Sequence, residues 1–415
     1  MPEPAASAEG SKPVRIGLLG RGTVGAAFSE LLAERADAVE AATGRRVEIA
    51  GVLTRSEGDF ESILEESDLV VELMGGTDPA RDHVLEALRA GRPVVTANKQ
   101  LLAQHGAELF AAAREAGVQL RFEAAVAGVI PIVRTIQESF GTTEISKVFG
   151  IVNGTTNFIL TEMAATGAGY DEVLARAQKL GYAEADPSDD VSGADAAAKM
   201  AILARLAFHT PVTLSEVSYE GIEGIQPDDL AYAKELGLSL KLLGAAERRD
   251  GGISVRVFPC FLYPGHPLAP IEGPFNAVMV EAPAITEVTM SGPGAGGLQT
   301  ASAVLGDVVS ILAGEVPVHE TRAELPLVAD VTSSFYLYLE VADRPGVLAR
   351  VATVLGDHEV SVKSVVQRGA EDDARLVMVV HECLESRFAA AVEALGELDD
   401  MRAPPRSIHV IEEEF

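Results

Sequence analysis

The sequence has few of the residues that mark metal centres, disulfide scaffolds and nucleic-acid-binding surfaces. Its 415 residues include 2 cysteines and no tryptophan. Cys260 and Cys383 lie far apart in unrelated contexts, so they predict no disulfide framework and no redox or zinc motif. With 33 basic against 62 acidic residues the formal net charge is −29. This charge repels phosphate backbones and excludes nucleic-acid binding as a main role.

Long apolar runs are also lacking. No stretch approaches the roughly 20 residues that a membrane-spanning helix needs, and no secretory signal precedes the first predicted strand. We therefore expect a cytoplasmic protein without a membrane partner. The length predicts two or three domains, after a loose, polar tail of about a dozen residues.

Strand-like and helix-like segments alternate over the first 130 residues, which predicts a doubly wound α/β domain of the Rossmann type. We expect this domain to span 12–130 and to be completed by a helix at about 300–320. The predicted strands are Val14 to Gly20, Val47 to Leu53, Asp68 to Met74, Pro93 to Thr96 and Val118 to Glu123; the predicted helices are Thr23 to Arg35, Pro79 to Ala90 and Leu101 to Ala116.

The regular alternation of strand-like and helix-like segments ends after residue 130, and a mixed α+β domain is expected over 131–300. It should contain a helix from Tyr170 to Leu180, an alanine-rich helix to about His209, and antiparallel strands at 253–262 and 277–290. The predicted helix from Ala301 to Ala313 is the one that completes the first domain. After a linker at 326–334, residues 333–415 follow the order β-α-β-β-α-β, which predicts a ferredoxin-like domain.

A G-x-G-x-x-G motif joins the first predicted strand to the first helix. Glycines at these positions permit a tight turn and a close approach of a pyrophosphate to the helix start; a purely structural turn is the alternative. The motif is Gly20, Arg21, Gly22, Thr23, Val24 and Gly25. At the end of the second strand Arg55 stands where NAD-binding domains carry an acid, which favours NADP, although a solvated loop arginine is the alternative.

Two further strands end in segments that suit a site. Met74-Gly75-Gly76 follows the third strand, and Thr96-Ala97-Asn98-Lys99 follows the fourth. Open α/β sheets bind their ligands at the carboxyl ends of strands. A lysine at a helix start is disfavoured by the helix dipole, which favours a function for Lys99 over a role as the first residue of the next helix.

Carboxylates crowd one stretch that ends in a lysine. The stretch 181–199 contains Glu184, Asp186, Asp189, Asp190, Asp195 and Lys199. Asp195 and Lys199 are four apart and share a helical face, so an exposed ion pair worth a few tenths of a kcal/mol is one interpretation. The helix is otherwise alanine and apolar, however. A half-buried lysine among carboxylates suits a substrate with an amino group and an oxygen to be protonated.

Two more segments offer polar backbone groups. Asn153-Gly-Thr-Thr-Asn157 places amides and hydroxyls at a helix start, which indicates either capping or a cradle for a substrate carboxylate. Glu123 and the carbonyl groups that precede Pro131 offer oxygen ligands for a monovalent or hard cation.

Together these motifs resemble homoserine dehydrogenases over nearly the entire chain. The resemblance implies that the first domain binds NADP or NAD, with Gly75, Thr96, Lys99, Gly292 and Gly294 contributing. The residues that carry it are Gly20 to Gly25, Thr96 to Lys99, Glu123 to Pro131, Asn153 to Asn157, Gly181 to Lys199, Gly292 to Gly297 and Thr300 to Ala303.

The resemblance also implies roles for individual residues. Glu184 and Asp195 would hold the amino group of homoserine, Lys199 would be the proton donor, and Lys99 would lie near nicotinamide and substrate. The other substrate-binding residues would be Asp190, Gly154, Thr155 and Gly181. A sodium-like ion would be held by Glu123 and the carbonyls of Val126, Gly128 and Ile130.

The C-terminal segment resembles an ACT domain, with the signature Asp343-Arg-Pro-Gly-Val-Leu348 at a strand-to-helix turn. In this family the implied effector is threonine. No aspartate kinase domain precedes residue 14, so the resemblance is to the single-function form. Antiparallel middle-domain sheets and ACT domains both tend to pair, which favours a homodimer or homotetramer.

The expected activity is NAD(P)-dependent interconversion of L-aspartate 4-semialdehyde and L-homoserine, in threonine, methionine and isoleucine biosynthesis. A hydroxy-acid dehydrogenase would need a catalytic histidine paired with a carboxylate, and none of the 8 histidines lies in such a motif. Thiol-dependent semialdehyde oxidation would need a cysteine with a partner histidine after a site-forming strand. A non-catalytic amino-acid sensor would have no physical need for both Lys99 and Lys199.

Overall fold

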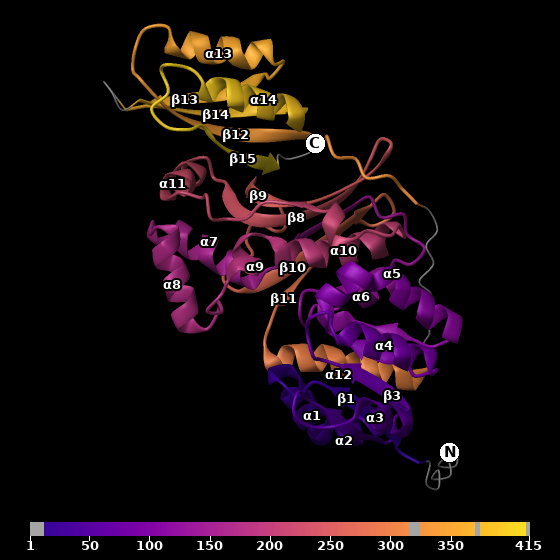
Figure 1. Ribbon diagram of the computed structural model, residues 1–415. Helices are drawn as coiled ribbons and strands as arrows, with labels where there is room; N and C mark the ends of the chain where they lie inside the picture. Colours follow the sequence, from indigo (N-terminus) through magenta and orange to yellow (C-terminus); the bar gives the residue numbers. More distant parts are fainter. Residues whose placement is uncertain (1–11, 315–323, 370–373, 412–415) are drawn as a thin grey trace, which may run out of the picture. The chain divides into compact units, whose positions relative to one another are not determined.

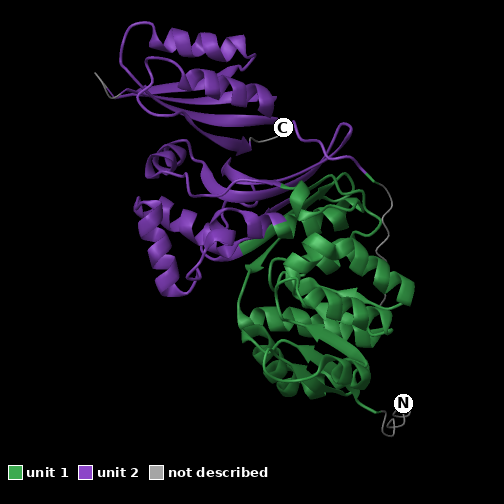
Figure 2. Cartoon of the chain, in the orientation of Figure 1, with its two compact units in different colours: residues 1–148, 198–217, 276–324 green, residues 149–197, 218–275, 325–415 purple. Residues whose placement is uncertain are grey.

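The computed structural model describes residues 12–314, 324–369 and 374–411, shown in Figure 1. The chain forms two compact units, coloured in Figure 2. Unit 1 comprises 1–148, 198–217 and 276–324; unit 2 comprises 149–197, 218–275 and 325–415. The predicted N-terminal tail and residues 315–320 of the helix expected at about 300–320 lie outside the described residues.

Unit 1 contains a five-stranded parallel sheet in the order β2-β1-β3-β4-β5. The predicted doubly wound α/β fold is thereby confirmed. β3 is apolar except for its last residue and is buried along its length, as parallel strands covered on both faces are. Strands β2 and β3 lie on opposite sides of β1, which makes the carboxyl end of β1 a topological switch point. The strands are β1 (Val14–Leu19), β2 (Val47–Leu53), β3 (Leu69–Glu72), β4 (Val94–Thr96) and β5 (Leu120–Arg121).

Helices pack on this sheet through apolar faces. Phe28 and Leu32 of α1 share a core with Ala301 and Val304 of α12 and with Ile16 of β1. Two short helices of the unit, α2 and α3, were not predicted. The helical segments are α1 (Thr23–Glu34), α2 (Ala36–Thr43), α3 (Phe60–Glu66), α4 (Ala80–Arg89), α5 (Lys99–Ala116), η1 (Glu123–Ala125), α6 (Ile132–Arg134), η2 (Thr135–Ser139), η3 (Leu214–Glu216) and α12 (Gly297–Ala313).

Strands β10 (Phe275–Ala282) and β11 (Thr286–Pro293) pair with each other. The antiparallel segment predicted at 277–290 is therefore two strands, which are joined by a turn in which Ile285 N–H donates to Ala282 O. Helix α10 (Ala194–Phe208) confirms the predicted alanine-rich helix, and α12 begins at Gly297, earlier than predicted.

Unit 2 contains strands in the order β6-β8-β9-β15-β12-β14-β13, with β7 alongside β9. Helix α11 and strand β8 were not predicted. The strands are β6 (Lys147–Ile151), β7 (Ser218–Tyr219), β8 (Ser239–Arg249), β9 (Gly252–Leu262), β12 (Thr332–Val341), β13 (Val362–Arg368), β14 (Ala374–Leu384) and β15 (Arg406–Ile411); the helices are α7 (Gly154–Thr166), α8 (Tyr170–Leu180), α9 (Ser188–Val191), α11 (Pro227–Glu235), α13 (Val347–Asp357) and α14 (Glu385–Gly396).

The last six of these elements in the chain follow the predicted β-α-β-β-α-β order. Phe335, Leu337 and Leu339 alternate along β12 and pack with residues of α13 and α14, which cover one face of the sheet (Figure 1). Tyr336 and Tyr338 point to the other face and are also buried. β12 begins at Thr332, so the predicted linker at 326–334 is shorter than expected.

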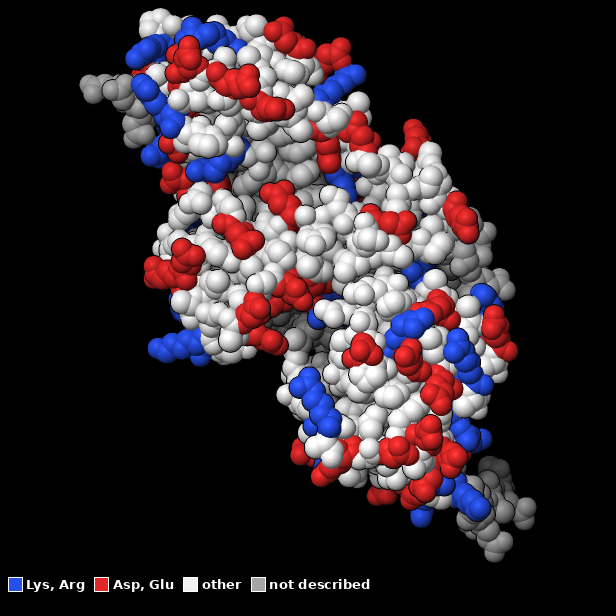
Figure 3. All heavy atoms as spheres, viewed as in Figure 1, with Lys and Arg blue, Asp and Glu red and all other residues white. Residues whose placement is uncertain are grey.

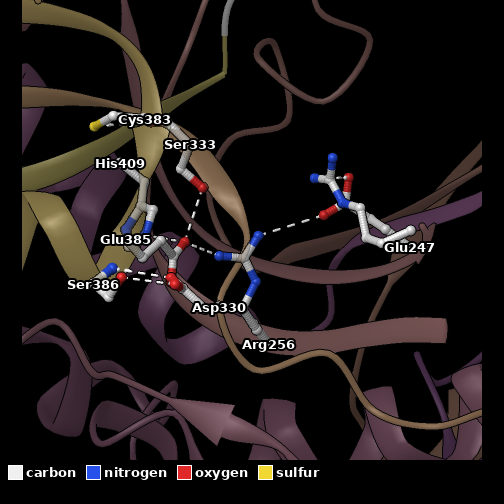
Figure 4. Close-up of polar contacts among 9 residues, drawn as sticks. Glu247, Arg256, Asp330, Ser333, Cys383, Glu385, Ser386 and His409 are labelled. Carbon is white, nitrogen blue, oxygen red and sulfur yellow. Dashed lines mark hydrogen bonds and ion pairs between the residues drawn. The ribbon is translucent and has the colours of Figure 1, made fainter. Parts of the chain in front are cut away.

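The ferredoxin-like sheet is joined to the rest of unit 2 by a strand pair. β15 runs parallel to β9, with His409 opposite Cys260 and Ile411 opposite Leu262. Beside this strand pair, which we call the β9–β15 joint, Arg256 of β9 pairs with Glu247 of β8 at 3.4 Å and with Glu385 of α14, as Figure 4 shows. Glu385 also accepts hydrogen bonds from Ser333 at 2.8 Å and from His409 at 3.1 Å. We call Glu247, Arg256, Ser333, Glu385 and His409 the Arg256 cluster.

The described helices include none that is long and apolar enough to cross a membrane. Acidic side chains, red in Figure 3, are spread over both units on the face drawn. This distribution agrees with the net charge of −29.

Candidate active site

The glycines of the first strand-to-helix turn have different surroundings. Gly20 has φ +99, and a Cβ there would lie 2.6 Å from the carbonyl of Leu73. A Cβ on Gly25 would lie 2.2 Å from the Gly20 carbonyl oxygen, whereas one on Gly22 would meet nothing within 4 Å. Gly20 and Gly25 thus allow close backbone packing, and Gly22 leaves space in front of the helix.

The first turn of α1 suits an anion. Gly22 is its N-cap, no side chain caps it, and no acidic residue lies in its first turn. The start of α12 lies against it, since a Cβ on Gly297 would be 3.1 Å from Thr23 Cγ2. The glycine-rich segment 292–297 and the G-x-G-x-x-G turn therefore meet in unit 1, where backbone N–H groups and space can receive a phosphate.

A buried carboxylate organises the ends of β3 and β4. Glu72 is fully buried and accepts hydrogen bonds from Thr96 Oγ1 at 2.6 Å and from Met74 N–H at 2.7 Å. Burial raises the pKa of Glu72, against the effect of these hydrogen bonds. Asn98 donates to Gly76 O at 2.6 Å and caps α5 by accepting from Leu101 N–H at 3.0 Å. These contacts fix the two predicted loops to each other.

Lys99 is the first residue of α5 and is half-buried. It therefore stands at the carboxyl edge of the parallel sheet, directly after Asn98. Arg55 is exposed in the turn after β2, where Thr54 Oγ1 accepts from Glu57 N–H at 3.0 Å. This turn presents the guanidinium to solvent at the same edge of the sheet.

The segment predicted to hold a cation is buried and tightly turned. Ala127 and Gly128 both have positive φ, of 56 and 63. The carboxylate of Glu123 accepts hydrogen bonds from the N–H groups of Val133 and Arg134, at 2.8 and 2.9 Å. Its side chain thus caps the start of α6.

Asp307 of α12 adds a second buried carboxylate, which accepts from Glu123 N–H at 2.8 Å. Burial, together with the charge of Asp307, raises the pKa of Glu123 to about 7. Burial likewise raises the pKa of Asp307 to about 6, against Glu123 N–H and the charges of Arg121 and Arg134. Arg134 reaches Asp307 at 3.4 Å. Two buried carboxyl groups with raised pKa values therefore lie side by side, with the charges of Arg121 and Arg134 near them.

Asn276 lies near this segment with no partner. It is 1% exposed, and neither Oδ1 nor Nδ2 has a hydrogen-bond partner among the described residues. Its carboxamide packs on Gly294, where a Cβ would lie 2.2 Å from Asn276 Cγ. The other side of Gly294 contacts Gly128, whose Cβ would lie 2.6 Å from the Gly294 carbonyl oxygen. A buried carboxamide without partners is unfavourable unless a ligand satisfies it.

Unit 2 brings two of the predicted carboxylates together through one amide. Asn153 is buried and caps α7, where its Oδ1 accepts from Thr156 N–H at 2.9 Å. Its Nδ2 donates to Asp190 at 2.7 Å and to Asp195 at 2.9 Å. Asp195 is 5% exposed and Asp190 is half-buried. Two carboxylates held by one neutral amide form a site for a cationic group.

The other predicted substrate residues lie around the start of α7 and the end of α8. Thr155 donates to Tyr182 O at 2.7 Å, and Gly181, with φ 79, ends α8. Gly154 is the first residue of α7, which has no acid in its first turn. The carboxylate of Glu184 is exposed and makes no hydrogen bond or ion pair within the described residues, so the structure does not join it to Asp195.

Lys199 lies on α10, four residues after Asp195. The helix is apolar on most positions, and Lys199 itself is half-buried. This agrees with the expectation that it is not on a fully solvated face.

Sequence reasoning missed Glu72; for Asn153 it gave capping as one interpretation, which the structure bears out, but missed the contacts with Asp190 and Asp195. Glu72 could have been found because it is a carboxylate at the end of an otherwise apolar strand. An asparagine directly between a strand and a helix is a signal for Asn153, although the motif was recognised without these contacts. The thiols of Cys260 and Cys383 are free and buried, and burial raises the pKa of both, which opposes thiolate chemistry. The described residues hold no group of three or more His, Cys, Asp or Glu side chains that could bind a metal.

Comparisons with known proteins agree along the chain. The family described as "Homoserine dehydrogenase" matches 131–309, "Homoserine dehydrogenase, NAD binding domain" matches 20–123, and "ACT domain" matches 335–400. A homoserine dehydrogenase of Corynebacterium glutamicum is 44% identical over 409 residues, which cover 92% of each chain.

Two solved structures extend the comparison. A homoserine dehydrogenase from Thiobacillus denitrificans is 37% identical with a TM-score of 0.92, over 97% of this chain and 99% of that one. A hyperthermophilic archaeal homoserine dehydrogenase in complex with NADPH is 26% identical with a TM-score of 0.64, over 74% of this chain and 99% of that one.

Proposed function

The chain belongs to the homoserine dehydrogenase family, and from this premise we propose how its residues interconvert L-aspartate 4-semialdehyde and L-homoserine. The observation that carries the proposal is the pair Asp190 and Asp195, held by Asn153 at 2.7 and 2.9 Å. Lys199 follows on the same helix as Asp195. The two carboxylates suit the ammonium group of a substrate, and the lysine suits an oxygen that is to be protonated.

The substrate is a zwitterion, and each end needs a partner. Asp195, Asp190 and the exposed Glu184 bind the ammonium group. The backbone N–H groups of Gly154 and Thr155 at the start of α7 bind the carboxylate, because a helix start attracts negative charge. Gly181 lets the chain turn beside them.

Lys199 is the proton donor in the reducing direction. When bound, the nicotinamide cofactor supplies the hydride to the aldehyde carbon. Lys199 gives a proton to the substrate oxygen as its charge develops, and takes it back in the oxidising direction. Lys99 orients the substrate and stabilises that charge.

The cofactor residues are those of the G-x-G-x-x-G turn with Gly75, Thr96, Lys99, Gly292 and Gly294. The open space at Gly22 and the uncapped start of α1 fit a pyrophosphate. Arg55, exposed after β2, would meet a 2′-phosphate, so NADP is the preferred form. The archaeal relative in complex with NADPH supports this choice.

A monovalent cation such as sodium belongs to the segment from Glu123 to Ile130. Its ligands would be Glu123 and the carbonyls of Val126, Gly128 and Ile130. The residues fit the ion, because the buried carboxyl groups of Glu123 and Asp307 have raised pKa values that a nearby cation would lower, and Asn276 has a buried amide oxygen without a partner among the described residues. Both carboxylate oxygens of Glu123 already accept hydrogen bonds at the start of α6. The backbone carbonyl oxygens would therefore be the main ligands of the cation.

The ACT domain binds a small amino acid, and threonine is the proposed effector. The turn from Asp343 to Leu348 leads into α13, with Gly346 at φ 92 as its N-cap. We expect the enzyme to act as a homodimer or homotetramer in the cytoplasm, where both buried cysteines stay reduced.

The first test is oxidation of NADPH and NADH with aspartate semialdehyde, with and without threonine. We expect turnover with NADPH in preference to NADH, and suppression by threonine. Lys199→Met should lower kcat by about 100-fold or more, the range of general acid catalysis, with an unchanged circular dichroism spectrum. Near-normal turnover of this variant would show that Lys199 is not the proton donor, and turnover indifferent to threonine would reject the effector.

A further inference from the structure

A buried lysine, Lys241, lies outside all the residues assigned so far. It is on β8 and is 4% exposed. Its Nζ donates to the carbonyl of Ile271 and, at 3.4 Å, to Oδ1 of Asn157. Within the described part of the chain, no carboxylate lies at ion-pair distance from it. A buried ammonium group without a counter-charge is unfavourable, so its position calls for a function.

Asn157 connects Lys241 to α7. It is 1% exposed, and its Nδ2 donates to Ile271 O at 3.2 Å and to Phe275 O at 3.1 Å. One turn further along α7, Thr161 Oγ1 accepts from Gly273 N–H at 3.1 Å. Lys241 and the segment 271–275 are therefore fixed beneath the first two turns of this helix.

The ammonium group thus lies close to the helix start. Asn157 N–H donates to Asn153 O, so one helical turn, a rise of about 5.4 Å, separates Asn157 from the N-cap. A cation near a helix start is disfavoured by the helix dipole unless an anion lies there too. No acid in the first turn of α7 supplies that anion.

The acidic groups around this place have other roles or are further away. Asp190 of α9 and Asp195 of α10 face the N-cap through Nδ2 of Asn153, and they are proposed to bind the ammonium group of the substrate. Glu272 follows Ile271 and acts on Lys241 through its charge alone. The substrate carboxylate is an anion that suits this place, because it would balance the charge of Lys241 at the helix start.

We propose that Lys241 is a positioning residue for substrate binding, whose buried positive charge beneath α7 strengthens the capture of the substrate carboxylate by the N–H groups of Gly154 and Thr155. The proposal rests on the substrate site described under the proposed function. Lys241 acts through the helix and through Asn157, without touching the substrate.

Lys241 changes its charge at a pH that can be reached with the folded enzyme. Burial lowers the pKa of Lys241 to about 8, although the charge of Glu272 opposes this shift. The ammonium form is therefore lost as the pH rises through 8. We expect the KM for homoserine to rise over the same range.

The test is the oxidation of homoserine between pH 6.5 and 9.5, with kcat and KM measured separately. We expect Lys241→Met to raise the KM for homoserine by about 10-fold at pH 7, while kcat changes by less than about 3-fold. In this variant the rise of KM around pH 8 should disappear. Lys241→Arg should keep a low KM with no inflection, since arginine stays charged. Lys234→Met, on the exposed side of α11, is the matched control.

A structural role alone would not alter the pH profile of KM. A normal KM at pH 7 in Lys241→Met, or the same inflection in both enzymes, would overturn the proposal. Should Lys241→Met fail to fold, Glu272→Gln decides, because loss of that charge should move the inflection to lower pH, and an unmoved inflection rejects the idea. If the unmodified enzyme fails to oxidise homoserine, the proposed function itself is wrong.

Discussion

Gly22 and Gly25 belong to one motif but face different surroundings. A Cβ on Gly25 would lie 2.2 Å from the Gly20 carbonyl oxygen, and one on Gly22 would meet nothing within 4 Å. Gly22 has φ −75, which any residue can adopt. Gly25 therefore serves the fold, whereas Gly22 serves only what approaches the turn.

The two alanine variants should separate these roles. Gly25→Ala should lower the free energy of unfolding by about 1–3 kcal/mol, the cost of overpacking. Gly22→Ala should leave stability unchanged and raise the Kd for NADPH by about 10-fold, because the added methyl group enters the space that the pyrophosphate needs. Urea unfolding and fluorescence titration with NADPH measure the two effects. Equal loss of stability in both variants would contradict the assignment.

Residues with local signals could be predicted from the sequence, and residues with distant partners could not. The glycine turn, the position of Lys99 after the fourth strand and the Asp195–Lys199 spacing lie within short stretches. Asn153 joins Asp190, which is 37 residues away, and Lys241 joins Asn157, which is 84 residues away. No spacing rule reveals such pairs, because only the fold brings them together.

At the scale of elements, the joint between β9 and β15 makes the ACT domain part of a larger sheet. The Arg256 cluster reinforces this joint. Burial alone would raise the pKa of Glu385, but the hydrogen bond from His409 and the charge of Arg256 outweigh it and lower the pKa to about 2. Arg256 also lies over the ring of Phe258, at 4.9 Å from its centroid.

Glu385→Gln should weaken this joint more than a surface change on the same helix. The variant leaves the buried Arg256 with Glu247 as its remaining carboxylate, so we expect a loss of about 2 kcal/mol in the free energy of unfolding, somewhat below the usual cost of breaking a buried pair. The control Arg387→Gln removes an exposed pair with Glu359 and should cost less than about 0.5 kcal/mol. Similar losses in urea unfolding of both variants would show that the cluster contributes little.

The elements missed from the sequence have physical reasons. β8 is buried on both faces over most of its length, so it lacks the alternation that identifies a strand with one wet face. Helices α2 and α3 span 8 and 7 residues, which is too short for a clear helical period. The turn within the predicted segment 277–290 was missed because the residues there, Ala282 to Ile285, are all apolar, although Pro283 is itself a turn signal.

At the scale of the whole molecule, pH should act on stability through Glu123 and Asp307. Their pKa values of about 7 and about 6 exceed the ordinary 4.5 and 3.8. The folded chain therefore holds these protons more tightly than the unfolded chain. The resulting stabilisation is fully present below about pH 4 and is lost as the pH rises through 6 and 7.

We expect the free energy of unfolding to fall by about 1 kcal/mol as the pH rises from 6 to 8 in buffers free of sodium, because Glu123 loses its proton over this range. Glu123→Gln should flatten this part of the profile. Sodium should flatten it in the unmodified protein, because a cation near Glu123 favours the ionised carboxylate. Urea unfolding at each pH provides the measurement; an identical slope with and without sodium would reject the proposed cation.

The parallel joint between β9 and β15 also has a consequence for biosynthesis. Arg256 and Glu385 are 129 residues apart, and a ribosome adds roughly 5–20 residues per second, so the first is made on the order of ten seconds before its partner. During that interval the edge of β9 that will receive β15 is open to any other extended chain, including nascent copies on the same messenger RNA. The parallel sheet of unit 1 takes all its strands from the first third of the chain, so its strands can pair soon after they are made. Dependence on a chaperone should therefore be sought in the growing second unit.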